Sequence, residues 1–471
     1  MPVTHEVPLL VHLAYLAAAI CFIIGLKFLS SPATARTGNQ IAMIGMALAV
    51  GTTLFLPGLH NMGLIVGAMV IGGGLAAWAA RVVKMTDMPQ VVAMLNGLGG
   101  GAAALVSLSE LLHASRFAVS LTGTEAVSSV LGVLIGGLSF SGSMVAFGKL
   151  QGLISEKPLV FAGQKVVNTA LQIGMVALAI AVGVNHSPAL LFTYLAFVMF
   201  TGVMLVMPIG GADMPVVISL LNSFTGLAAA ATGFVLSNNA LIISGTLVGA
   251  SGTILTQLMC KAMNRSLANV LFSAFGAVVQ APGSAAGAGG KPANVRDVTP
   301  EDVAVLLANV QSLIVVPGYG MAVAQAQHVV REMCDMLGRH GVSVKYAIHP
   351  VAGRMPGHMN VLLAEANVPY DQLYDIDAIN PEFEHTDVAL VIGANDVVNP
   401  AARTDKTSPI YGMPILDVDK AKHIIIVKRS LNPGFAGVDN PIYYDPKTMM
   451  LFADAKSGIQ KVVEELKSQL G

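Results

Sequence analysis

Long apolar runs fill the first 260 residues of the chain. A bilayer core about 30 Å thick requires roughly 20 apolar residues for each helix that crosses it. Segments of about this length occur at 9–29, 40–57, 62–83, 90–112, 127–147, 164–184, 189–207, 215–235 and 240–260. Several neighbours are separated by only a few residues that are typical of turns. The pattern predicts a polytopic α-helical membrane domain of about nine helices.

The hydrophobic pattern changes after a stretch rich in Gly, Ala and Pro at residues 281–293, which is typical of a flexible tether. Short apolar runs rich in β-branched residues then alternate with helical stretches. These runs lie at 312–316, 342–348, 388–392, 423–427 and 450–453. Such runs, separated by helices, are typical of a parallel sheet with both faces covered. We therefore expect a membrane domain at 1–264, a linker at 265–305 and an α/β doubly wound, Rossmann-like domain at 306–471.

Composition excludes a wholly soluble protein. Only 11% of the residues are charged, whereas soluble globular proteins carry about 25%. Residues 1–289 contain 10 Lys and Arg and 6 Asp and Glu, and residues 290–471 contain 16 and 21. The three cysteines lie far apart, which excludes a disulfide framework and gives no metal-site spacing. A formal net charge of −1 argues against a nucleic-acid partner.

Charge also predicts the orientation in the membrane. Loops after the odd-numbered apolar segments contain nine Lys and Arg residues, whereas loops after the even-numbered segments contain only Arg116. Positive residues concentrate on the cytoplasmic side. The N-terminus is therefore expected outside, and the C-terminal domain in the cytoplasm.

An internal repeat marks two of the predicted membrane helices. The segment from Asp87 to Asn96 recurs, with conservative changes, as the segment from Asp213 to Asn222. Each Asp is well placed to cap a helix, and each Asn follows about 13 Å further along it. An amide in hydrocarbon either forms a hydrogen bond between helices or lines a polar pathway. Hydroxyls near Ser139 can join such a pathway, or can simply allow close packing.

A glycine fingerprint follows the first predicted strand. It reads Gly318, Tyr319, Gly320, Met321, Ala322, Val323. A GxGxx motif between a strand and a helix is typical of dinucleotide binding, because the backbone approaches the pyrophosphate at the helix N-terminus. The third small position is Val rather than Gly, which weakens the match.

The second predicted strand ends without the acidic residue that an NAD site places on the ribose. This absence favours NADP, whose 2′-phosphate a carboxylate would repel. Lys428, Arg429 and Ser430, after the strand at 423–427, offer two positive charges and a hydroxyl for that phosphate. The alternative is a solvated end of the strand.

Two further loops have the composition of ligand-binding loops. Residues 353–358 are Gly-rich and contain Arg354, as expected for a pyrophosphate or nicotinamide contact. Gly393, Ala394, Asn395 and Asp396 follow the carboxyl end of a strand, where doubly wound sheets bind ligands. Asp396 can also be an ordinary turn residue.

With these motifs and the segment Gly434, Phe435, Ala436, Gly437, Val438, Asp439, Asn440, the chain resembles the beta-subunit family of proton-translocating NAD(P) transhydrogenases over essentially its whole length. The resemblance implies that NADP(H) lies across the carboxyl edge of the sheet, with its pyrophosphate at 318–322 and its 2′-phosphate on 428–430. It implies that residues 434–440 act as a lid and that Asp396 links the cofactor to proton movement. Asp213, Asn222 and Ser139 would lie along the proton pathway.

The resemblance also implies a reaction and partners. The reaction is hydride transfer from NADH to NADP⁺, driven by protons that move inward across a bacterial inner membrane. NAD(H) would bind to an alpha subunit, in a dimer of alpha-beta units. Some family members carry His at the position of Asn96; since Asn cannot carry a proton, water chains or a histidine of the partner subunit would carry it here. The alternative from another class is a nucleotide-regulated ion channel or transporter without catalysis.

Overall fold

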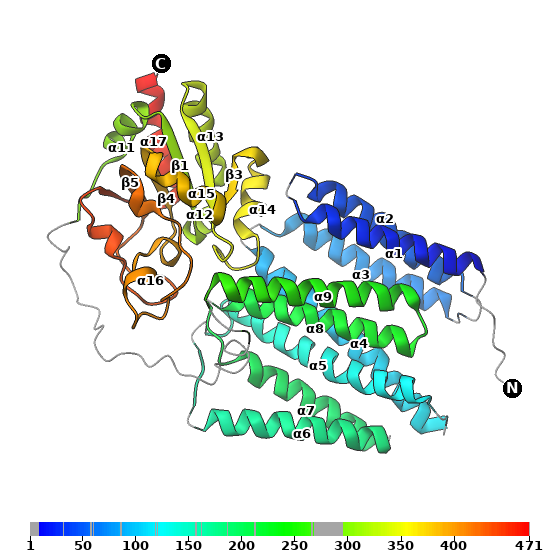
Figure 1. Cartoon of the computed structure of the whole chain (residues 1–471). Coiled ribbons are helices and arrows are strands. Elements are labelled where there is room, and N and C mark those ends of the chain that lie inside the picture. The colour runs from blue at the N-terminus through cyan, green and yellow to red at the C-terminus, as the bar shows by residue number, and fades with distance from the viewer. Residues whose placement is uncertain are drawn as a thin grey trace. The chain divides into compact units, whose positions relative to one another are not determined.

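The computed structural model describes residues 9–31, 33–56, 59, 61–84, 87–117, 119, 121–155, 158–161, 163–185, 187–211, 213–264, 267 and 295–470. They form two compact units, a helical one and one built on a sheet (Figure 1).

The helical unit contains nine long helices among its described residues. They are α1 (Leu9–Leu29), α2 (Ala35–Leu54), α3 (Met62–Val82), α4 (Met88–Phe117), α5 (Gly123–Leu150), α6 (Gln164–Val184), α7 (Pro188–Val206), α8 (Met214–Val235) and α9 (Asn239–Ala262). Eight of them are long and apolar enough to cross a membrane. The exception is α2, whose first turns carry Arg36, Asn39 and Gln40. The predicted membrane domain is confirmed, with eight spans supported by composition.

Helices α4 and α5 pack closely because small residues face each other. A Cβ on Gly136 would lie 2.6 Å from the carbonyl oxygen of Gly100, so neither backbone could approach as it does if Gly136 were larger. Close backbone contact between small residues is the usual basis of helix packing in membranes. It brings the polar side chains of α4 and α5 within hydrogen-bond distance of each other.

The second unit contains a sheet of six parallel strands. They are β1 (Ser312–Pro317), β2 (Ser343–Ile348), β3 (Leu373–Asp375), β4 (Val388–Ile392), β5 (His423–Lys428) and β6 (Thr448–Phe452). Their order is β3-β2-β1-β4-β5-β6, which is the order of a Rossmann fold. The five predicted strands are confirmed. Strand β3 was missed, because three residues ending in Asp375 give no recognisable apolar run.

Both faces of this sheet are covered, as continuous apolar strands require. One face packs Ile314, Val391 and Ile426 against Phe383 and Leu416 from the connecting segments. Helices α11 (Pro300–Ala308), α13 (Gln327–Arg339) and α17 (Ala455–Leu470) pack against one another beside the sheet (Figure 1). Because all six strands are parallel, they all end at the same edge of the sheet. The loops after β1, β2, β4 and β5 therefore lie together at this carboxyl edge.

Residues 295–305, which the sequence pattern assigns to the linker, belong to the sheet unit. The amide of Val298 donates to the carbonyl of Met450 in β6 at 3.0 Å. Thr299 then caps α11: its hydroxyl accepts from the amide of Asp302, and the Asp302 carboxylate accepts from the amide of Thr299. The remaining part of the predicted linker, apart from residue 267, lies outside the described residues.

Candidate functional site

The loops after β1 and β4 are in direct backbone contact at the carboxyl edge of the sheet. The amide of Gly318 donates to the carbonyl of Ile392, and that of Gly320 donates to the carbonyl of Gly393, both at 2.9 Å. Gly393 has a φ of +64°, which favours glycine. A Cβ on Gly320 would lie 2.7 Å from the Cα of Gly393. The fingerprint glycines therefore let two loops meet where the strand order reverses.

The helix after the fingerprint is only six residues long. Helix α12 (Tyr319–Ala324) ends at Gln325, which has a left-handed φ of +52°, and α13 begins two residues later. Met321 and Ala322 are buried, but Val323 is exposed. Val323 therefore does not pack against the strands as the third glycine of the usual fingerprint does.

Asp396, after β4, is held by the backbone of the predicted lid, the segment Gly434–Asn440. Its Oδ2 accepts a hydrogen bond from the amide of Ala436 at 3.0 Å. A Cβ on Gly434 would lie 2.7 Å from Oδ1, so the lid backbone lies directly against the carboxylate. Burial raises the pKa of Asp396, while the amides of Ala436 and Phe435 and the charge of Lys428 oppose that rise.

A hydrogen-bond network joins Asn395, the residue before Asp396, to Asn440 at the end of the lid. The Asn395 side-chain oxygen accepts from the amide group of Asn440 at 3.0 Å and from the hydroxyl of Tyr443 at 2.8 Å. Tyr443 in turn accepts from the Lys428 ammonium at 3.0 Å. The acidic residue of the lid, Asp439, is exposed and accepts a hydrogen bond from the hydroxyl of Tyr444. No sequence motif indicated Tyr443, because its partners lie 15 and 48 residues away.

The three residues predicted for the 2′-phosphate differ in their surroundings. Lys428 is half-buried, and its ammonium donates to the carbonyl of Asn432 as well as to Tyr443. Burial lowers its pKa to about 8. Arg429 is exposed and forms no hydrogen bond or ion pair within the described part of the chain. Among the described residues, the Ser430 hydroxyl has one hydrogen bond, a long one of 3.4 Å from the backbone amide of Asn432.

An aromatic cluster connects the fingerprint, the loop after β2 and the lid. The Arg354 guanidinium lies 4.5 Å from the ring centre of Tyr319. The Tyr319 ring also lies 5.7 Å from that of Phe435 in the lid and 6.5 Å from that of His358. Side chains from three of the predicted ligand-binding segments thus lie around Tyr319. Gly437, in the middle of the lid, has open space around it.

In the helical unit, four polar side chains form a cluster on α4, α5 and α8. The amide group of Asn96 donates to the hydroxyl of Ser143 at 2.9 Å. The hydroxyl of Ser139 bonds to the carbonyl of Leu221 at 2.9 Å and to the hydroxyl of Thr225 at 2.6 Å. Thr225 also donates to the carbonyl of Asn96 at 3.3 Å. Asn96 and Ser139 therefore share one network, which includes the unpredicted Thr225.

The other two residues predicted for the proton pathway lie outside this network. Asn222 is half-buried on α8, and its side chain forms no hydrogen bond to any described residue. Asp213 is half-buried immediately before α8. The structure therefore joins only part of the predicted pathway.

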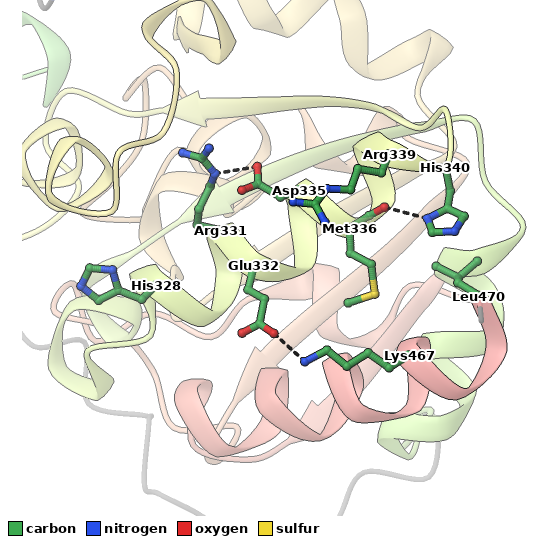
Figure 2. Close-up of a pocket in the computed structure, with 9 residues that line it drawn as sticks. All are labelled: His328, Arg331, Glu332, Asp335, Met336, Arg339, His340, Lys467 and Leu470. Atoms are coloured by element: carbon green, nitrogen blue, oxygen red, sulfur yellow. Dashed lines mark hydrogen bonds and ion pairs between the residues drawn. The ribbon is translucent and has the colours of Figure 1, made fainter.

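A separate pocket lies between α13 and α17 (Figure 2). It is lined by surface ion pairs, Arg331 with Asp335 and Lys467 with Glu332, each at 2.6 Å. It shares no residue with the predicted nucleotide site. Among the described residues, no group of three or more His, Cys, Asp and Glu side chains is arranged to hold a metal ion.

Comparison with known proteins agrees with the geometry of the loops and helices. The model of the family "NAD(P) transhydrogenase beta subunit" matches residues 11–465. Two proteins named NAD(P) transhydrogenase subunit beta, from Rhodospirillum rubrum and from its strain ATCC 11170, are each 49% identical to this chain over 459 residues. These matches cover 96% of this chain and 98% of each relative. A beta subunit of this kind is a component of an oxidoreductase, and its name implies an alpha-subunit partner. The chain therefore belongs to the NAD(P) transhydrogenase beta-subunit family.

Proposed function

We propose that this chain binds NADP(H) at the carboxyl edge of its sheet and couples the binding to proton movement across the membrane. The observation that carries the proposal is the contact between the Asp396 carboxylate and the backbone of the lid. A titratable group that holds a covering segment can link protonation to opening and closing of a site.

The residues at this edge fit a phosphorylated dinucleotide. Residues 318–322 are proposed to face the pyrophosphate, with Arg354 nearby, and Lys428, Arg429 and Ser430 to hold the 2′-phosphate. Two buried polar atoms at the edge have no partner among the described residues, the Nδ2 of Asn395 and the Oδ1 of Asp396. Bound ligands commonly satisfy such atoms. When bound, NADP⁺ supplies the hydride chemistry, and the protein positions and covers it.

Protonation of Asp396 provides the proposed coupling. As a carboxylate, Asp396 accepts the amide of Ala436 in a charge-assisted hydrogen bond, but burial beneath the lid disfavours its charge and raises its pKa. Protonation therefore favours the closed lid, and ionisation favours opening. Since linkage is reciprocal, a change in cofactor affinity with protonation implies a change in proton affinity with cofactor binding.

The membrane pathway is proposed to use Ser139, Asn96 and Thr225, with Asp213 and Asn222 along its course. Asn96 does not titrate, so it can only orient water or a neighbouring group. The proposed orientation places the N-terminus outside and the sheet domain, here from residue 295 onward, in the cytoplasm of a bacterium. NAD(H) is proposed to bind the alpha subunit, in a dimer of alpha-beta units in the inner membrane.

The test uses the complete complex of alpha and beta subunits in liposomes. Addition of NADH and NADP⁺ is expected to produce NADPH together with a change in internal pH, and beta subunit alone is expected to produce neither. Tight binding of NAD(H) by the beta subunit, equal to that of NADP(H), would contradict the proposal. Solute or ion flux without hydride transfer would support a nucleotide-regulated transporter instead.

A further inference from the structure

His358 lies at the end of the loop after β2 and begins helix α14 (His358–Glu365). Its side chain is only 1% exposed. The loop is shaped around its ring: Gly353 has a φ of +105°, and a Cβ there would lie 2.5 Å from Nδ1. The chain therefore uses a glycine to accommodate a buried imidazole.

The hydrogen bonds of His358 define which ring nitrogen carries its proton. Nδ1 accepts a hydrogen bond from the backbone amide of Arg354 at 3.1 Å. Burial, with a contribution from the charge of Arg354, lowers the pKa of His358 to about 4. The ring is therefore neutral at physiological pH, and its proton is on Nε2, which is a hydrogen-bond donor.

This Nε2 donor is buried and has no acceptor among the residues that the structure describes. Buried donors in folded proteins are nearly always paired, because an unpaired one loses its hydrogen bonds to water. An unpaired donor inside a ligand-binding region is satisfied when the ligand provides an acceptor.

His349 shows what a structural histidine looks like in the same loop. It is 2% exposed, and burial lowers its pKa to about 4 as well. Its Nδ1 accepts from the amide of Val351 at 3.3 Å, and its Nε2 bonds to the carbonyl of Pro414 at 2.8 Å. Both nitrogens of His349 are thus paired within the protein, whereas His358 has one left over.

The surroundings of His358 identify the kind of acceptor. Its ring lies 6.5 Å from that of Tyr319, which is part of the glycine fingerprint. The Arg354 guanidinium, whose charge acts on His358, lies over the same Tyr319 ring. An anionic oxygen suits a position next to a cation and a glycine-rich loop.

From this geometry we infer that the Nε2–H of His358 donates a hydrogen bond to a pyrophosphate oxygen of the bound dinucleotide. His358 is then a cofactor-binding residue as well as a core residue. The inference rests on the proposed NADP(H) site and specifies one contact within it.

The test compares His358→Phe with His349→Phe in the complete alpha-beta complex. His358→Phe is expected to raise the NADPH dissociation constant about 10-fold. Because the Arg354 amide also loses its acceptor, the melting temperature without nucleotide is expected to fall, but by no more than in His349→Phe. His349→Phe is expected to lower that melting temperature, since Pro414 and Val351 lose their partner, and to leave the NADPH affinity of the folded fraction unchanged. Affinity for 2′-AMP, which lacks the pyrophosphate, is expected to be the same in His358→Phe and the unaltered complex.

A second measurement needs no substitution. Solid-state ¹⁵N spectra of histidine-labelled complex are expected to show the Nε2–H signal of His358 moving to a hydrogen-bonded position when NADPH is added. The inference is overturned if the unaltered complex binds NADPH and His358→Phe binds it equally well, or if 2′-AMP loses the same affinity as NADPH. If the unaltered complex binds no NADPH, the proposed function fails instead.

Discussion

The polar cluster of the helical unit and the loop cluster of the sheet unit are built from different chemistry. The membrane cluster consists of one amide and three hydroxyls, from Asn96, Ser139, Ser143 and Thr225. The loop cluster contains the carboxylate of Asp396 and the ammonium of Lys428. Charged groups are costly inside a bilayer, whereas amides and hydroxyls can be paired there at lower cost. Of these two clusters, only the one in the sheet unit contains groups that can change charge.

The two clusters also differ in what their hydrogen bonds connect. In the membrane cluster, side chains join one helix to another, as Ser139 of α5 joins α8 through Leu221. In the loop cluster, the Asp396 carboxylate holds the backbone of a short segment without regular structure. A segment of this kind can move without repacking a core. The sheet unit is therefore the better place for a switch, and the membrane cluster for a fixed path.

The largest expected effect is the loss of activity on replacing Asp396, the titratable group of the loop cluster. Replacement of Asp396 by Asn removes the charge and leaves only one acceptor oxygen for the lid backbone. We expect the rate of NADPH formation by the complex to fall about 100-fold or more, because Asn can neither bind nor release the proton on which the proposed switch depends. The matched control is Asp405→Asn, an exposed carboxylate that also accepts a backbone amide, from Thr407 at 2.9 Å. An Asp396→Asn complex as active as the control would show that the switch lies elsewhere.

The same substitution has a pH signature. Burial raises the pKa of Asp396 above its value of about 3.9 in the unfolded chain. The folded state therefore binds this proton more tightly, and stability falls as pH rises from the unfolded pKa through the folded one. Asp396→Asn is expected to raise the melting temperature at pH 7 and to leave it unchanged below about pH 3. A lower melting temperature at pH 7 would mean that the lid contacts outweigh the cost of burial.

The next effect tests the charges of the loop cluster. Arg429 is exposed and pairs with nothing within the described chain. Arg429→Met is expected to weaken NADPH binding about 10- to 100-fold through loss of a phosphate contact, with NADH binding and the melting temperature unchanged. Calorimetry on the complex measures both affinities. Arg339→Met, an exposed arginine in the pocket of Figure 2, is the control and is expected to change neither. Equal losses for NADPH and NADH would place Arg429 away from the 2′-phosphate.

A smaller effect is expected in the membrane cluster. Ser139→Ala removes two hydrogen bonds to α8, while Ser141→Ala, two residues away, removes bonds only to carbonyls of its own helix. A hydrogen bond between membrane helices is worth about 0.6 kcal/mol, or roughly a factor of three. We expect proton uptake into liposomes to slow about threefold in Ser139→Ala and to be unchanged in Ser141→Ala. Identical rates for the two variants would remove Ser139 from the path.

Much of the architecture could be predicted because it depends on local pattern. Runs of about 20 apolar residues predict helices, and β-branched runs after a tether predict strands. The fingerprint and the loop at Asp396 could be placed at one edge, since parallel strands bring their carboxyl ends together. Strand β3 was not predicted, because its three residues show no hydrophobic pattern typical of a strand. The break after α12 was not predicted either, because glutamine is not a residue type that indicates the left-handed conformation found at Gln325.

The contacts that define the two clusters were beyond sequence reasoning. Ser139 and Thr225 are 86 residues apart, and their meeting depends on the rotation of α5 against α8. Tyr443 and Asn395 meet across 48 residues. His358 could be read as an ordinary loop residue, because its unpaired nitrogen becomes visible only once its neighbours are placed. Sequence thus locates the chemical groups, and packing decides which of them interact.

The smallest effect determines how far the membrane cluster extends. Ser107, further along α4, bonds to the hydroxyl of Thr232 on α8 at 3.3 Å. Thr232 also donates to the carbonyl of Ala228 at 2.9 Å, so it stays paired if Ser107 is lost. Ser107→Ala is therefore expected to cost about 0.6 kcal/mol of stability or less, with proton uptake unchanged. If uptake instead slows as much as in Ser139→Ala, the proposed proton pathway includes the hydroxyls of Ser107 and Thr232. The pathway then extends further along α4 than the cluster around Asn96.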